Sequence, residues 1–218
     1  MPVLIGVISQ KGGVGKSTLA RMIAREYAAA GWEVKLADLD TAQGTSTSWQ
    51  SRRLRETIEP KVSVEQFQTV PQALRDQSRY DLLVFDGAPH SSQMTRDIAR
   101  AADVVLLPTG LSVDDLEPTV LLANELVERG IDRDKLAFAL CRVGDSDVEL
   151  TEARSYVECA GYTLLAGAVP EKTAYRRASD TGRAVTETRF PSLNTKAEQL
   201  AQSIINLVEQ RVALKGAA

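Results

Sequence analysis

The stretch VLIGVISQKGGVGKSTLARMIAREYAAAG (residues 3–31) decides the fold of this chain. Its apolar run Val3–Ser9 predicts a strand buried on both faces. The segment Ser17–Ala30 has the apolar spacing of a helix, and Gly31 is suited to the left-handed position that follows a helix. A buried strand, a glycine-rich turn and a helix in this order are typical of a loop that binds phosphate.

The same alternation continues along the chain. Further strands are expected at Glu33–Asp38, Val62–Phe67, Asp81–Asp86, Val104–Pro108, Leu136–Cys141 and Thr163–Val169. Helices are expected at Pro71–Ser78, Ser91–Ala102, Val113–Arg129, Asp147–Ala160 and Thr195–Leu214. This pattern predicts a doubly wound α/β fold, the P-loop NTPase fold, in which helices cover both faces of a mostly parallel sheet. The loops that follow the strands then share one edge, where we expect the chemistry.

Composition sets further bounds. We expect a single domain over residues 1–218, with the helix at about 195–214 docked on the sheet. The net charge is −3, so contact with nucleic acid requires a local basic patch. The two cysteines lack a metal-binding spacing, and neither a signal peptide nor an apolar run of about 20 residues is visible. We therefore expect a cytoplasmic protein without stable membrane association.

The loop itself predicts nucleotide chemistry. Lys16 places a charge at the terminal phosphates, Ser17 places a hydroxyl for Mg²⁺, and Thr18 can reach another phosphate. The residues expected to line the nucleotide are Gly12, Gly13, Val14, Gly15, Lys16, Ser17 and Thr18. Gln10 occupies the place of the usual first glycine, and a second lysine, Lys11, follows it. Lys11 lies at the rim of the loop and is hard to justify within one subunit.

Acidic residues end two of the expected strands. Asp38 and Asp40 follow one apolar run, and Asp86 follows another. Asp86 fits a Walker B carboxylate, which usually holds Mg²⁺ through water. A single Asp at a strand end is often only a helix cap, so that alternative stays open for each.

Several segments together resemble a known family. KGGVGKST (residues 11–18), DLDTAQGTSTSW (38–49) and FDGAP (85–89) are similar to the deviant Walker A ATPases of the ParA/MinD type. The similarity is closest to small plasmid-partition ATPases. LLPTGLSVDDLEPT (106–119) and AVPEKTAYRRASDTGRAV (168–185) are weaker matches to later parts of that family.

The resemblance implies roles around the phosphates. Lys11 would be the signature lysine that reaches the nucleotide of a second subunit, and Gly12 would lie at the crowded dimer face. Lys11, Lys16 and Asp40 would be catalytic, with Asp40 orienting the attacking water. Asp38 would support the metal and lysine network. Mg²⁺ would be held by Ser17, Asp40 and Asp86.

The resemblance also implies a base site. Arg142 would pack on the adenine of ATP or ADP, with Pro170 and Glu171 beside the base. Cys141 stands where many members of the family have Asn, which departs from the family pattern at this point.

Partners follow from the same resemblance. ATP would drive a homodimer that binds non-specific DNA of the nucleoid, and an adaptor or centromere-binding protein would stimulate hydrolysis and release it. Contacts should be made to phosphate. The candidate DNA-binding residues are Lys172, Arg176, Arg177, Arg183, Arg189 and Lys196. The alternative for each of them is a solvated charge on the surface.

Other functions remain open at this stage. The cargo is plasmid or chromosomal DNA, or else a protein assembly such as a carboxysome or a chemotaxis cluster. A small-molecule P-loop kinase would leave Lys11 unexplained, and a MinD-like membrane switch would need a stronger tail than QRVALKGAA. His90, the lone histidine, is interpreted as a surface loop residue without a catalytic role.

Overall fold

The computed structural model describes residues 1–89 and 92–216 and contains a seven-stranded sheet. The strand order is β3-β2-β4-β1-β5-β6-β7, and every neighbouring pair is parallel. The strands are β1 (Val3–Val7), β2 (Val34–Asp38), β3 (Ser63–Gln66), β4 (Leu82–Asp86), β5 (Val104–Thr109), β6 (Leu136–Val143) and β7 (Thr163–Pro170). The predicted fold class is confirmed.

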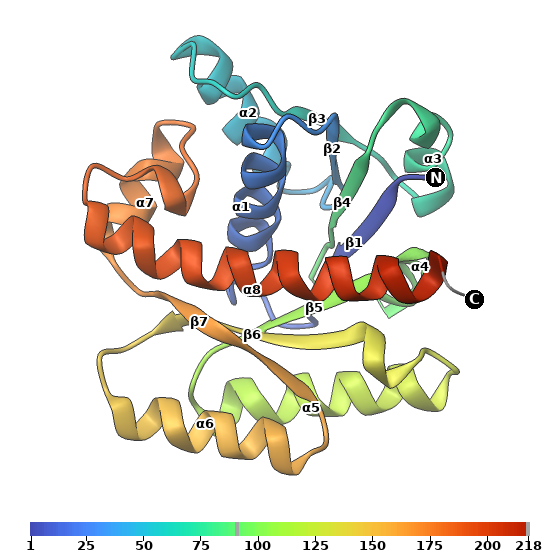
Figure 1. The fold of residues 1–218 in the computed structure, drawn as a ribbon, viewed down its shortest axis with the longest axis vertical. Helices are drawn as coiled ribbons and strands as arrows, with labels where there is room; N and C mark the ends of the chain where they lie inside the picture. The colour runs from blue at the N-terminus through green and yellow to red at the C-terminus, as the bar shows by residue number, and fades with distance from the viewer. Residues whose placement is uncertain (90–91, 217–218) are drawn as a thin grey trace.

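Helices cover both faces of the sheet (Figure 1). The helices are α1 (Lys16–Ala29), α2 (Thr45–Arg55), α3 (Val70–Ala73), α4 (Ser92–Ala101), α5 (Val113–Glu128), α6 (Asp147–Cys159), α7 (Thr173–Asp180) and α8 (Pro191–Gly216). Short 3₁₀ turns are η1 (Gln77–Arg79), η2 (Arg133–Lys135) and η3 (Val185–Glu187). Helices α1 and α8 share one core with Trp49 of α2, whereas α4, α5 and α6 pack into the core on the opposite face.

The helix predictions were incomplete. The sequence patterns did not predict α2 or α7. The helix expected at Pro71–Ser78 is a single turn followed by η1, because only Val70 and Ala73 of α3 are buried and a short helix needs tertiary packing. The C-terminal helix begins at Pro191, ahead of the expected 195, because proline suits the first helical position. Among the residues of α8 whose burial is described, Val208 is the last in the buried core.

The register of the central strands positions the site. Val7 of β1 and Asp38 of β2 both pair with Asp86 of β4. The loop after β1 and the two acidic strand ends therefore meet at one edge, as parallel strands require. No helix in the described ranges is both long enough and apolar enough to cross a bilayer.

Candidate nucleotide site

The loop before α1 has the geometry of an anion cradle. Gly15 caps the helix with φ 110°, in the left-handed region. A Cβ added to Gly15 would lie 2.9 Å from the Cβ of Cys141 and 3.2 Å from its sulfur. Cys141 therefore packs directly against the loop. A glycine is required at position 15 both because its φ is left-handed and because a side chain there would clash with Cys141. The free N–H groups at the start of α1 and the helix dipole favour an anion here.

Lys16 is held inside this loop. Its side chain is buried, and its ammonium donates a 2.9 Å hydrogen bond to the carbonyl of Lys11. Burial lowers the pKa of Lys16, although Asp86 and Asp40 act in the opposite direction. A buried ammonium beside oriented amides is complementary to a phosphate.

Asp86 is a buried acid with one unsatisfied oxygen. One oxygen of Asp86 accepts a 2.6 Å hydrogen bond from the Ser46 hydroxyl, while the other is buried without a hydrogen-bond partner. Burial raises the pKa of Asp86 to about 6. Arg21 donates to the same Ser46 hydroxyl at 3.1 Å. An unpartnered buried oxygen calls for a ligand or a metal-bound water.

Asp38 has a different role. One of its oxygens accepts hydrogen bonds from the backbone N–H groups of Ser46 and Thr47, both at 3.0 Å. This is the helix-cap role that the sequence left open, and it fixes the start of α2. Asp38 is fully buried and does not line the cavity described below.

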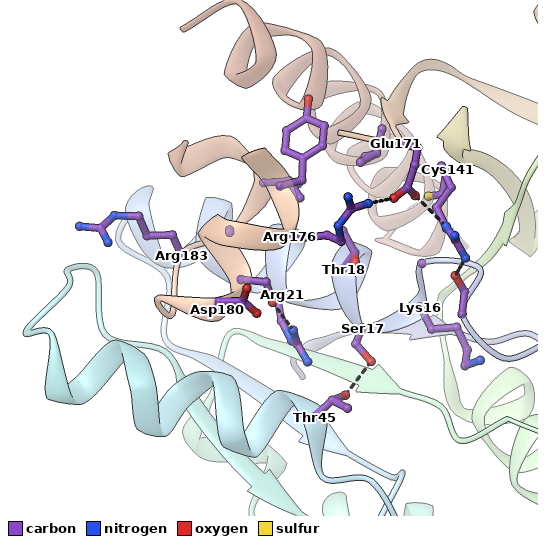
Figure 2. A pocket seen from close by; sticks show the side chains of 18 of the residues that line it. Lys16, Ser17, Thr18, Arg21, Thr45, Cys141, Glu171, Arg176, Asp180 and Arg183 are labelled. Atoms are coloured by element: carbon purple, nitrogen blue, oxygen red, sulfur yellow. Dashed lines mark hydrogen bonds and ion pairs between the residues drawn. The ribbon is translucent and has the colours of Figure 1, made fainter. Parts of the chain in front are cut away.

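The donor set fits Mg²⁺. The hydroxyls of Ser17 and Thr45 lie 3.1 Å apart. Figure 2 shows the two side chains directed towards one another. The carboxylate of Asp40 lines the same cavity and accepts from the backbone of Gln43. The described residues hold no group of three His, Cys, Asp or Glu side chains that could bind a metal alone. Mg²⁺ usually takes few protein ligands and completes its shell with water and phosphate, so this oxygen-only set suits it.

A cavity of about 990 Å³ extends from the phosphate loop towards β7 and α7. Arg142, Pro170 and Glu171 lie along it, where the base was expected. Arg142 has a left-handed φ of 57°, and its guanidinium donates to Glu171 at 2.8 Å and to the carbonyl of Gly13 at 2.9 Å. Arg142 therefore joins the far end of the cavity to the phosphate loop. The volume is at the upper end of the range for small-molecule sites.

Lys11 has a partner within its own subunit. Its ammonium contacts the carboxylate of Asp115 and lies 3.2 Å from the carbonyl oxygen of Asp114, at the start of α5. The argument that Lys11 is hard to justify within one subunit is therefore corrected. Gly12 beside it faces open space, because a Cβ added there would meet nothing within 4 Å.

The six basic candidates do not form one uniform patch. Lys172 pairs with Asp145 at 2.7 Å. Arg176 pairs with Glu171, and Figure 2 shows these two side chains facing each other. Arg177 and Arg183 line the cavity with them. Two others stand apart from the cavity lining: Arg189, which lies over the Phe190 ring, and Lys196 on α8.

Comparison with known proteins then decides the family. Residues 5–214 match the CobQ/CobB/MinD/ParA nucleotide binding domain. The chain belongs to this family.

Two curated proteins are similar in sequence to part of this chain. The chromosome-partitioning ATPase Soj of Thermus thermophilus is 32% identical over 57% of this chain and 61% of its own length. The maintenance of carboxysome distribution protein A of Gloeobacter kilaueensis is 35% identical over 50% of this chain and 49% of its own. The chain thus spans about half to three fifths of these relatives.

A solved structure shows the same fold. The septum site-determining protein MinD of Pyrococcus horikoshii, complexed with Mg-ADP, aligns with a TM-score of 0.74 and 16% identity. The alignment covers 97% of this chain and 99% of that one. At this identity the likeness establishes the fold.

The sequence patterns did not identify several residues of this site. Thr45 and Arg52 of α2, together with Arg21 of α1, line the cavity, and Ser46 supports Asp86. The run of hydroxyls in TSTSW (residues 45–49) is the sequence signal that points to Thr45 and Ser46. His90 lies outside the described residues.

Proposed function

We propose that this chain is a Mg²⁺-dependent ATPase that forms a homodimer on binding ATP and positions a cargo. The observation that carries the proposal is the meeting of Lys16, Ser17 and the unpartnered oxygen of Asp86 at the start of α1. A buried cation, a hydroxyl and a carboxylate at a phosphate cradle are the parts that phosphoryl transfer needs. The MinD structure with Mg-ADP and the partition and carboxysome relatives support the same class.

The residues of this site have distinct roles in the proposed hydrolysis of ATP to ADP and phosphate. The loop amides and Lys16 bind the phosphates, and Asp40 orients the attacking water from the open side of the cavity. Ser17 would hold Mg²⁺ directly, with Asp86 and Asp40 holding it through water. The metal supplies charge neutralisation on the phosphates. Arg142, Pro170 and Glu171 would hold the base.

The proposed dimer interface lies at the exposed side of the phosphate loop. Gly12 is exposed and lacks close neighbours in its own subunit, so another backbone can approach there. Lys11, whose side chain is 46% exposed, lies beside it and can supply a charge to a second nucleotide.

DNA binding is assigned to the basic rim of the cavity. Arg52, Arg177 and Arg183 line it, and none of them forms an ion pair with another described residue. Guanidiniums without a carboxylate partner suit phosphate contacts without base readout. Lys172 and Arg176 would first have to leave their acidic partners. The cargo would be plasmid or chromosomal DNA recruited through an adaptor that stimulates hydrolysis, in a cytoplasmic, nucleoid-associated protein. The relative that distributes carboxysomes favours a protein cargo as the second candidate.

The test measures molecular size and DNA retention with ATP. Asp40→Ala should trap an ATP-bound dimer that retains non-specific DNA, whereas Lys16→Ala should weaken nucleotide binding itself. A chain that stays monomeric and ignores DNA would refute the proposal. Transfer of phosphate to a small acceptor would favour a kinase, and ATP-dependent liposome binding lost on deletion from Arg211 would favour a membrane switch.

A second measurement locates the DNA surface. The double variant Arg177→Ala/Arg183→Ala should lower affinity and reduce the salt slope by about one to two, since each phosphate contact contributes about 0.9. Arg129→Ala/Arg154→Ala is the matched double control, because these side chains are 50% and 43% exposed and both lie outside the cavity lining. An equal loss in both variants would show that only total charge matters.

A further inference from the structure

Arg21 of α1 is a buried cation whose hydrogen-bond partners are hydroxyls. It is 8% exposed, and Figure 2 shows its side chain among those that line the cavity. Its Nε donates to the Ser46 hydroxyl at 3.1 Å, and one of its terminal nitrogens donates to the Ser179 hydroxyl at 3.0 Å. A guanidinium has five N–H donors, and these are its two hydrogen bonds within the described ranges. Arg21 therefore keeps donors for a ligand in the cavity.

A second guanidinium meets Arg21 at Ser179. The Nε of Arg52 donates at 3.2 Å to the carbonyl of Ser179, while Arg21 holds the hydroxyl of the same residue. Burial is the main cause that lowers the pKa of Arg21; Asp86 acts to raise this pKa, and the charge of Arg52 acts to lower it. Two like charges brought together in a partly dehydrated cavity repel each other unless an anion lies between them.

The two ends of the cavity differ in how their cations are neutralised. At the base end, Arg142 and Arg176 both contact Glu171, and Lys172 contacts Asp145. At the end formed by α2 and α7, four guanidiniums line the cavity without an ion pair to a described residue: Arg21, Arg52, Arg177 and Arg183. Asp180, which is exposed to solvent, also lines this end. The excess of positive charge is therefore concentrated away from the base.

We propose that Arg21 and Arg52 form a second anion site, which takes a free phosphate group. Arg21 lies one helical turn beyond Ser17 on α1, so this site is separate from the phosphate loop. Ser48, one turn before Arg52 on the same face of α2, lines the cavity and supplies a further hydroxyl donor. Guanidinium forks and hydroxyls that converge on one point are the groups that recognise phosphate. ATP bound at the phosphate loop does not account for this second set of donors.

The depth of Arg21 favours a small anion over nucleic acid. The phosphates of a duplex contact side chains at the protein surface, and Arg21 is buried. A phosphate group in solution can enter the cavity of about 990 Å³. Arg177 and Arg183 are exposed and stay available for the DNA contacts of the proposed function. The phosphate group comes either as inorganic phosphate, which ATP hydrolysis releases, or on a small phosphorylated metabolite.

The experiment fills the phosphate loop first. The chain is saturated with Mg²⁺ and a non-hydrolysable ATP analogue and then titrated calorimetrically with inorganic phosphate. We expect one saturable site per chain. Arg52→Gln and Arg21→Gln should each weaken this binding about tenfold or more, because each removes charge-assisted hydrogen bonds. Glucose 6-phosphate is the second probe: tighter binding than inorganic phosphate assigns the site to a metabolite, and weaker binding assigns it to inorganic phosphate.

Matched variants test the assignment to these two guanidiniums. Arg129→Gln on α5 removes the same charge from a side chain that is 50% exposed and outside the cavity lining, so phosphate affinity should not change. Arg21→Lys keeps the charge and should restore part of the affinity. Urea unfolding checks each variant. If the buried Arg21 variants do not fold, Arg52→Gln carries the test, because Arg52 is only half-buried.

Distinct outcomes separate this site from the proposed function. Absence of saturable phosphate binding to the loaded wild type overturns the second site, as does an equal loss of affinity in Arg129→Gln. Loss of DNA retention in Arg21→Gln, without phosphate binding in the wild type, would assign the inner guanidiniums to the DNA surface instead. Lys16→Ala, which disables the phosphate loop, should still bind inorganic phosphate. If phosphate binds there while the wild type neither dimerises nor retains DNA with ATP, the proposed function fails and the second site stands.

Discussion

Asp86→Asn should stabilise the protein without ligands. Asp86 is 1% exposed, and one of its oxygens is buried without a partner. Burial raises its pKa from 3.8 to about 6. A pKa difference of one between the folded and unfolded states corresponds to about 1.4 kcal/mol, so the ionised group destabilises the folded state by about 3 kcal/mol.

The sign of the pH dependence follows from the raised pKa. The folded state holds the Asp86 proton more tightly than the unfolded chain does, so unfolding free energy falls as pH rises from about 4 to about 6. Above that window the full penalty applies. Asp86→Asn should therefore be more stable than wild type by about 2–3 kcal/mol at pH 8, and the gap should close towards pH 4.

Urea unfolding at several pH values, without Mg²⁺ or nucleotide, measures this difference. Asp76→Asn is the control, because Asp76 is exposed and its substitution removes the same charge from a site outside the core. Adding Mg-ATP should reverse the order, since wild type gains binding free energy that the Asp86→Asn variant loses. The reasoning is refuted if Asp86→Asn is less stable at pH 8, or if the gap is the same at every pH.

Further predictions concern glycines and a buried ion pair. Gly15→Ala should destabilise the chain by about 1–3 kcal/mol and abolish nucleotide binding, because φ is 110° and Cys141 lies 2.9 Å from the new Cβ; urea unfolding and a nucleotide titration measure the two effects. Gly12→Ala should leave urea stability unchanged and weaken ATP-driven dimerisation; an unchanged dimer would count against a crowded interface there. Glu187→Gln should lower unfolding free energy by about 3–5 kcal/mol, because Arg53, 1% exposed, loses its carboxylate. Burial acts to raise the pKa of Glu187, but hydrogen bonds from Arg53 and the Ala184 backbone outweigh it and lower the pKa. The gap between Glu187→Gln and wild type should thus narrow as pH falls below about 4.5 in urea titrations, and a constant gap would contradict this ion-pair account.

The parts of the site that sequence predicted depend on local signals. Strand, loop and helix around Lys16 follow one another directly, so apolar spacing and glycines were sufficient. The whole parallel sheet followed from the same alternation, because buried strands and amphipathic helices differ in period.

The parts that sequence missed depend on distant contacts. Helix α2 is rich in Ser and Thr and has low intrinsic helix propensity. It forms because Asp38 caps its start, Trp49 is fully buried and Arg53 pairs with Glu187. The Lys11–Asp115 contact spans 104 residues, and no local pattern encodes such a pairing.

Helix α2 joins the phosphate loop to the basic rim of the cavity. At its start, Thr45 faces Ser17 and Ser46 holds Asp86. At its end, Arg52 donates to the carbonyl of Ser179, and the Arg53 backbone passes so close to Gly182 that an added Cβ would lie 2.3 Å away. Eleven residues at 1.5 Å each make a rigid rod of about 16 Å between these ends. Because both ends are tightly packed, α2 ties the hydroxyls beside the phosphate loop to the segment that carries Arg183.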